Sequence, residues 1–152
     1  MKNTSLVYIE KDNKYLMLHR TKKINDENHD KWIGVGGKME EGESPFDCAR
    51  REIFEETGLY GLELSYRGIV TFVSNEFGTE YMHLFTATGK IDYVRECDEG
   101  ELVFIEKNNI SQLPIWEGDK IFLDLLNKNV PFFSLKLVYD NERLTKHVIE
   151  YI

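Results

Sequence analysis

The sequence predicts an α/β or α+β fold, in which strands lie before, between and after two helices. Short runs rich in β-branched and aromatic residues, separated by turn residues, are typical of strands. A capped amphipathic segment in the first half of the chain and a shorter one near residue 120 are typical of helices. The 152 residues suffice for a core without staples, and we expect residues 1–152 to form a single domain.

Turn residues separate the expected strands. Asp12-Asn13 lies between the first two strands, while 75–78 and Asp140-Asn141 each lie between strands that we expect to pair as hairpins. A polar stretch over 21–31 predicts a mobile loop. The expected strands are 5–9, 14–20, 62–73, 81–88, 102–105, 132–139 and 144–151, and the second helix is expected over 120–126.

The first helix has the clearest signals at both ends. Ser44 is a good N-cap, Pro45 suits the first helical position, and Asp47 favours the positive end of the helix dipole. Gly58, one residue after Thr57, is the expected stop. The sequence therefore predicts a helix over 45–57.

Charge restricts the partners that we expect. The formal charge of −8 disfavours non-specific binding to DNA or RNA, because an acidic surface repels polyanions. A small phosphorylated ligand is still allowed, because a divalent cation reverses the local sign. Segments 37–59 and 96–101 each carry a net charge of −4, so the rest of the chain is neutral.

The cysteine spacing and the lengths of the apolar stretches indicate the cellular compartment. Cys48 and Cys97 form no CxxC motif, which predicts two reduced thiols in the cytoplasm. No stretch approaches the ~18 apolar residues of a membrane span, and residues 1–10 contain no signal-peptide core. We therefore expect a cytoplasmic chain that does not contact the membrane.

Three glutamates of the first helix, Glu52, Glu55 and Glu56, stand at i, i+3 and i+4 and so share one face. A solvated acidic face is the alternative to a site. The glycine pair Gly36-Gly37, where a side chain would obstruct or φ must be positive, precedes the helix and favours a site. Hard oxygen ligands on a rigid helix suit Mg²⁺ or Mn²⁺, which in turn bind phosphates.

Segment 37–59 resembles the Nudix box at every fixed position. The matching residues are Gly37, Glu43 and the run R-E-I-F-E-E-T-G-L over 51–59. The resemblance implies an α/β/α sandwich around a mixed β-sheet. It also implies hydrolysis of a nucleoside diphosphate linked to another group, with Mg²⁺ as the cofactor and Mn²⁺ as a possible substitute.

The resemblance also implies roles for particular residues. Glu52, Glu55 and Glu56 would hold the metal and act in catalysis, Glu52 as a ligand or base, and Gly37 would add its carbonyl oxygen. Many members of the family have a further metal ligand or base in a later loop. We expect Glu99 to take this role, and the alternative is a solvated acidic turn. Water would then attack the bridging diphosphate with help from the metal, and a carboxylate would orient or deprotonate it.

Other matching or basic residues are expected to support the site. Glu43 and Arg51 resemble the pair that holds the box loop against the helix. Basic residues near the loop are candidates for phosphate contacts, with ordinary solvation as the alternative: Arg20, Lys22, Lys23 and Lys38.

Segments 32–38 and 113–119 resemble the MutT-like branch of the family, which hydrolyses oxidised purine nucleoside triphosphates. By that resemblance Trp116 would stack on the purine and Asp119 would bond its edge. The alternatives are a core or lid role for Trp116 and an N-cap role for Asp119. Ile33 and Gly118 depart from the pattern, since that branch has an asparagine and an aspartate there.

The sequence thus predicts a Mg²⁺-dependent pyrophosphohydrolase that releases nucleoside monophosphate and pyrophosphate from substrates such as 8-oxo-dGTP. One alternative is hydrolysis of another nucleotide: an unmodified triphosphate, ADP-ribose or a nucleotide sugar. Another is a non-catalytic nucleotide-binding regulator, which we would expect to have lost a helix carboxylate. The expected partner is the nucleotide, without a nucleic-acid polymer, and a monomer and a homodimer are both left open.

Overall fold

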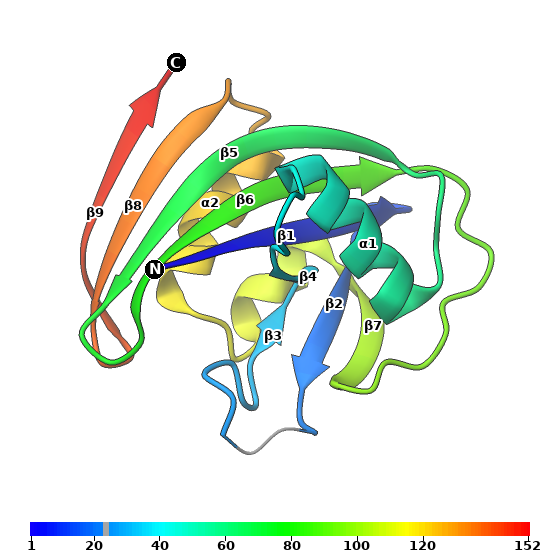
Figure 1. Ribbon diagram of the computed structural model, residues 1–152, viewed down its shortest axis with the longest axis horizontal. Helices are drawn as coiled ribbons and strands as arrows, with labels where there is room; N and C mark the ends of the chain where they lie inside the picture. The colour runs from blue at the N-terminus through cyan, green and yellow to red at the C-terminus, as the bar shows by residue number, and fades with distance from the viewer. Residues whose placement is uncertain (23–24) are drawn as a thin grey trace.

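Nine strands, two α-helices and one 3₁₀ helix make up the computed structural model, which describes residues 1–22 and 25–152 (Figure 1). The elements in chain order are β1 Lys2–Lys11, β2 Lys14–Arg20, β3 Trp32–Ile33, β4 Val35–Lys38, α1 Pro45–Thr57, β5 Glu63–Ser74, β6 Gly78–Thr88, β7 Gly100–Glu106, η1 Lys107–Gln112, α2 Glu117–Asn127, β8 Phe133–Asp140 and β9 Arg143–Tyr151. Across the described ranges, neither α-helix combines the length and apolar character needed to cross a bilayer.

The strands form a mixed sheet with β1 near its centre. The order is β3-β2-β1-β6-β5-β8-β9, with β4 paired to β1 and β7 paired to β2. The β1–β6 and β5–β8 pairs are parallel, whereas β5–β6 and β8–β9 are antiparallel hairpins. On the same edge, β1 pairs with β4 through Thr4–Val7 and with β2 only through Glu10 and Lys11. The sheet therefore splits beyond β1 into two branches, one with β4 and the other with β2, β3 and β7.

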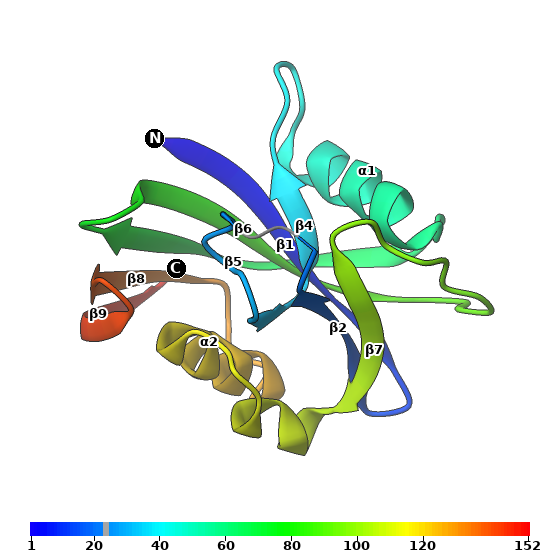
Figure 2. The same cartoon turned by 90° about the horizontal axis from the view of Figure 1, so that it is seen from below.

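Two hydrophobic cores lie on opposite faces of this sheet, one under each α-helix. In β1, Leu6 and Tyr8 join the core under α2, whereas Val7 and Ile9 join the core under α1, because successive strand residues point to opposite faces. Figure 2 shows α1 and α2 on opposite sides of the strands. This layering confirms the predicted α/β/α sandwich.

Helix α1 begins and ends where the sequence predicts. Ser44 Oγ accepts a hydrogen bond from the Asp47 N–H, and the Asp47 carboxylate accepts one from the Ser44 N–H, both at 3.0 Å. Gly58 ends the helix in the left-handed region, with φ at +79°. These caps fix the helix register, so Ile53 lies in the core and Glu56 is buried.

Several elements differ from the sequence-based prediction. Strands β3 and β4 were not predicted, because residues 32–38 contain three glycines and no alternating pattern. The η1 helix was also missed. Helix α2 begins at Glu117, three residues earlier than predicted, with Trp116 as its N-cap. The alternative role of Asp119 as the N-cap of this helix is therefore wrong, because Asp119 is the third residue of α2.

Candidate functional site

The glutamates of α1 lie at different depths beside β4. Glu56 is 5% exposed, and its Oε2 accepts a hydrogen bond from the Gly36 N–H at 2.8 Å. The Glu52 side chain is 14% exposed, whereas that of Glu55 is 55% exposed. A Cβ atom added at Gly37 would lie 2.6 Å from Glu52 Oε1, so glycine lets the Glu52 carboxylate approach the backbone of β4 in its present position.

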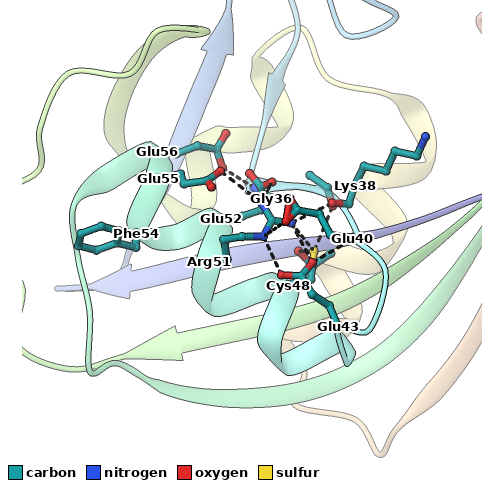
Figure 3. Close-up of polar contacts among 12 residues, drawn as sticks. Gly36, Lys38, Glu40, Glu43, Cys48, Arg51, Glu52, Phe54, Glu55 and Glu56 are labelled. Carbon is teal, nitrogen blue, oxygen red and sulfur yellow. Dashed lines mark hydrogen bonds and ion pairs between the residues drawn. The ribbon is translucent and has the colours of Figure 1, made fainter.

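Arg51 connects the acidic residues of the loop and the helix (Figure 3). Its guanidinium donates to both oxygens of Glu43, at 2.7 and 2.9 Å. It also donates to Glu52 at 2.8 Å, to Glu55 at 3.2 Å and to the Lys38 carbonyl at 3.0 Å. One cation thus offsets the repulsion among three carboxylates and ties the loop to α1, which is the geometry that the predicted supporting role of Glu43 and Arg51 requires.

Within residues 1–22 and 25–152, no hydrogen-bond donor reaches the buried Oε1 of Glu56. The Glu99 carboxyl contacts Glu56, but a charged carboxylate has no hydrogen to donate. Burial raises the pKa of Glu56 well above its usual range, the charges of Glu99 and Glu52 raise it further, and the hydrogen bond from Gly36 opposes the rise. Burial also raises the pKa of Glu52. A nearby cation would stabilise the charged form of these groups.

Glu99 reaches the same place from the loop before β7. One of its oxygens lies 3.1 Å from Arg20 Nη1. Glu56, Cys97 and Glu99 each offer a ligand atom, and these three atoms lie within 4.8 Å of one another. We call Glu52, Glu56 and Glu99 the carboxylate cluster. That Glu99 binds a metal stays a prediction, but its position is the one that this role requires.

The donor set fits a divalent cation. The carboxylate cluster supplies hard oxygens. A cation would stabilise the charged form of buried Glu56, whose Oε1 accepts no hydrogen bond from residues 1–22 and 25–152. Glu55 is not brought into this group, because it is exposed and held by Arg51. The Gly37 carbonyl, the further predicted ligand, lies 3.4 Å from the Cys48 thiol, which donates to it.

A pocket of about 300 Å³ opens beside the carboxylate cluster. Gly36, Gly37 and Lys38 line it next to the cluster, and Trp116 and Asp119 also line it. The other lining residues are Lys2, Thr4, Ser5, Leu6, Arg20, Asp26, Glu27, Asn28, Ile33, Gly34, Phe72, Glu80 and Met82. One pocket is therefore lined both by the glycine strand β4 and by Trp116 and Asp119, which are far apart in the sequence, while the glutamates of the carboxylate cluster lie behind β4 and do not line it.

Trp116 belongs both to this pocket and to the core under α2. It is 5% exposed, and Phe72 and Tyr139 pack edge-on against it with ring centroids 5.4 and 5.1 Å away. Its Nε1 donates to Asn28 Oδ1 at 2.9 Å, and the Lys31 ammonium lies 4.6 Å from its ring centroid. The indole is thus fixed in place, which suits both the core role and the base-stacking role.

Asp119 is an acid buried at the pocket wall. It is 6% exposed, and burial raises its pKa to about 8. Lys31 opposes this rise, and the charge of Glu80 adds to it. A carboxyl group with such a pKa is mostly protonated at neutral pH and can donate a hydrogen bond.

The basic residues predicted to contact phosphates have different positions. Arg20 lines the pocket and lies 2.8 Å from the Asp26 carboxylate. Lys38 also lines the pocket and is exposed. Lys22 donates instead to a backbone carbonyl at 2.9 Å, away from the pocket. Lys23 lies outside the described residues.

Several pocket residues on the strands were not predicted from the sequence. Phe72, Met82 and Glu80 line the pocket from β5 and β6, where strand patterns mark burial but no site. Lys2 lies 2.9 Å from Glu27 and 3.4 Å from Glu80, so it joins the 21–31 segment to the sheet at the pocket wall. No local sequence signal identifies these residues, since β1 and β6 meet only in the folded sheet.

Known proteins resemble this chain in sequence and in structure. A family model described as the NUDIX domain matches residues 2–126. The uncharacterized Nudix hydrolase YvcI of Bacillus subtilis is 34% identical over 128 residues, covering 79% of this chain and 75% of its own. The oxidized purine nucleoside triphosphate hydrolase of Danio rerio is 29% identical over 124 residues, covering 79% and 78%. The crystal structure of a MutT protein from Bacillus halodurans aligns with a TM-score of 0.85 and 22% identity, over 99% of this chain and 98% of that one, and supports the fold.

The ion pair of Arg51 leads to a prediction for Glu43. Hydrogen bonds from Arg51 lower the pKa of Glu43 from 4.5 to about 2, so the pair stabilises the fold above about pH 4.5 and loses this effect as the pH falls toward 2. In Arg51→Met we expect the pKa of Glu43 to return toward 4.5 in an NMR titration of its carboxyl carbon. Arg50→Met is the control, because Arg50 packs on the Phe46 ring; an equal rise there would contradict the prediction.

The burial of Asp119 leads to a second prediction. Its pKa of about 8 exceeds the usual 3.8, so the native state binds the proton more tightly, and stability falls as the pH rises from about 4 to 8. Asp119→Asn removes this pH-dependent loss of stability, because asparagine does not titrate. Urea unfolding across the range should show the variant gaining stability relative to wild type as the pH rises. Asp124→Asn, at an exposed position of the same helix, is the control, and a pH-independent difference for Asp119→Asn would refute the prediction.

Proposed function

The chain belongs to the Nudix family, and we propose that it is a pyrophosphohydrolase of purine nucleoside triphosphates. The proposed substrate is an oxidised purine triphosphate such as 8-oxo-dGTP, cleaved to nucleoside monophosphate and pyrophosphate. The observation that carries this proposal is the pocket that Trp116 and Asp119 line together with Gly36, whose N–H binds Glu56 of the carboxylate cluster. The name of the Danio rerio relative supports the same substrate class.

We propose Mg²⁺ as the cofactor, with Mn²⁺ as a substitute. The carboxylate cluster and the Gly37 carbonyl would hold it. Glu55, which is paired with Arg51 and apart from the cluster in this structure, would join them when the cation binds. When bound, the cation supplies Lewis-acid polarisation and charge neutralisation of the phosphate oxygens.

The chain's own residues would position the water and the phosphates. Glu52 is the proposed group that orients and deprotonates the attacking water, because burial raises its pKa toward the range of an effective base. Arg20 and Lys38 would bind phosphate oxygens, since both line the pocket and carry positive charge. Arg51 would hold the loop against α1 through Glu43.

The purine would bind at the apolar part of the pocket. Trp116 and Phe72 offer aromatic surface, and Ile33 adds an aliphatic contact. Asp119, with a pKa of about 8, would donate a hydrogen bond to an acceptor on the base edge. Because Gly118 and Ile33 lack hydrogen-bonding side chains, base selectivity in this proposal depends mainly on Asp119.

A second candidate is hydrolysis of another nucleotide, such as an unmodified triphosphate, ADP-ribose or a nucleotide sugar. The apolar Ile33 in the pocket favours it, since this side chain cannot distinguish an oxidised base by hydrogen bonding. A non-catalytic regulator is disfavoured, because all the helix glutamates are retained.

We further propose that residues 1–152 form one cytoplasmic domain whose partner is the nucleotide. Cys48 and Cys97 are free thiols, which suits a reducing compartment.

A panel of substrates tests this function directly. 8-oxo-dGTP, dGTP, dATP, ADP-ribose and a nucleotide sugar are each incubated with the protein, with and without Mg²⁺, and products are separated by chromatography. We expect fastest turnover of 8-oxo-dGTP, to monophosphate and pyrophosphate, only with Mg²⁺. Preference for ADP-ribose would contradict the substrate proposal alone, and no turnover of any member would contradict the enzymatic one.

Glu56→Gln tests the proposed ligand set. Glutamine keeps the size of the side chain and an acceptor for the Gly36 N–H, so the fold should survive. Loss of the buried carboxylate should lower turnover by about 100-fold or more. Glu63→Gln is the matched control, because Glu63 is exposed at the start of β5, and wild-type activity in Glu56→Gln would show that our ligands are misassigned.

A further inference from the structure

Cys97 is a buried thiol beside the carboxylate cluster that the proposed mechanism does not use. It is 4% exposed and lies two residues before Glu99. Its sulfur and one oxygen each of Glu56 and Glu99 lie within 4.8 Å of one another. The other thiol, Cys48, has different neighbours, with its sulfur 3.2 Å from Ser5 Oγ. The two cysteines are therefore not equivalent with respect to a cation.

The Glu56 carboxylate is a second observation that points to a ligand site between these groups. Its side chain is 5% exposed, and Oε1 is buried without a hydrogen-bond partner in the described part of the chain. Its other oxygen is already bound to the Gly36 N–H, which fixes the carboxylate. A buried oxygen left in this way costs free energy unless a donor or a cation binds it.

A tight turn carries Cys97 and fixes its backbone. Cys97 and Gly100 form an antiparallel bridge there. A Cβ atom at Gly100 would lie 1.9 Å from the His19 carbonyl oxygen, so glycine is needed for this turn. The turn therefore fixes the backbone of Cys97 close to that of Glu99, next to Glu56.

We propose that Cys97 adds a sulfur ligand to Glu56 and Glu99, which makes this centre a site for a thiophilic divalent cation such as Zn²⁺ or Cd²⁺. Oxygen ligands alone suit Mg²⁺ and Mn²⁺, whereas a thiolate selects softer ions. Zn–S and Zn–O bonds of about 2.3 and 2.1 Å put ligand atoms roughly 3.5 Å apart, so the three groups need to close by only about 1 Å.

Binding exchanges two protons for the metal, one from the Cys97 thiol and one from the buried Glu56 carboxyl. The S–H bond of Cys97 and the O–H bond of Glu56 break, metal–sulfur and metal–oxygen bonds form, and both protons leave to solvent. A thiophilic ion held in this way competes with Mg²⁺ for Glu56 and Glu99. The inference rests on the proposed function only in that these two carboxylates face a cation.

Cadmium titration of the full chain tests the site without any nucleotide. One equivalent of Cd²⁺ should produce the ultraviolet cadmium–thiolate charge-transfer band in wild type and in Cys48→Ser, the matched control. In Cys97→Ser the band should be lost, and Cd²⁺ should bind at least about 10-fold more weakly. A band that persists in Cys97→Ser, or that disappears in Cys48→Ser alone, overturns the proposal.

Cadmium NMR of the wild-type complex gives the same answer without a substitution, so the test holds even where Cys97→Ser does not fold. A chemical shift typical of mixed sulfur and oxygen ligation is expected, and one typical of oxygen ligands alone overturns the proposal. The two proposals also fail separately. Mg²⁺-supported hydrolysis without a thiolate band overturns only the sulfur site, whereas a thiolate band without hydrolysis of any nucleotide overturns only the proposed function.

Discussion

The burial of Glu56 is the constraint on which the site depends. A carboxylate that is 5% exposed and close to Glu52 and Glu99 is unfavourable by itself, because burial and like charges both oppose ionisation. The structure compensates in part through the Gly36 N–H and through Arg51, which binds Glu52 and the acids around it. These contacts leave Oε1 of Glu56 unpartnered within the described ranges, and a cation is the group that would complete its surroundings.

The sheet determines how this acidic centre meets the pocket. Strand β1 pairs through Ser5 and Leu6 with Gly37 and Gly36, so the glycine strand lies against β1 on one side and beneath α1 on the other. Both faces of β1 are covered, with the α1 core on one and the α2 core on the other. Trp116, at the start of α2, therefore lines the same pocket as the glycines, although eighty residues separate them.

The parts that could be predicted from sequence depend on neighbours along the chain. Ser44, Pro45 and Gly58 fix α1 through local hydrogen bonds and backbone preferences, and the spacing of the glutamates follows from the helix. Strand β4 could not be predicted in this way, because its glycines give no strand pattern. Their close contacts with Ser5 and Glu52 exist only in the folded protein. The burial of Asp119 and the position of Cys97 likewise arise from contacts between distant segments.

The distribution of charge also combines a feature that the sequence shows with one that arises only on folding. Segments 37–59 and 96–101 each carry −4, and the fold brings them together at Glu56 and Glu99. Arg51 and Arg20 neutralise some of these acids, but both are already bound to carboxylates. The remaining negative charge is concentrated around Glu56 and Glu99, beside the Gly36 and Gly37 wall of the pocket, rather than spread over the surface. A polyanion without a cation is repelled there, whereas a phosphate that shares a divalent cation with these carboxylates is attracted. The acidity of the chain is therefore better understood as a requirement for a cation than as a barrier to phosphorylated ligands.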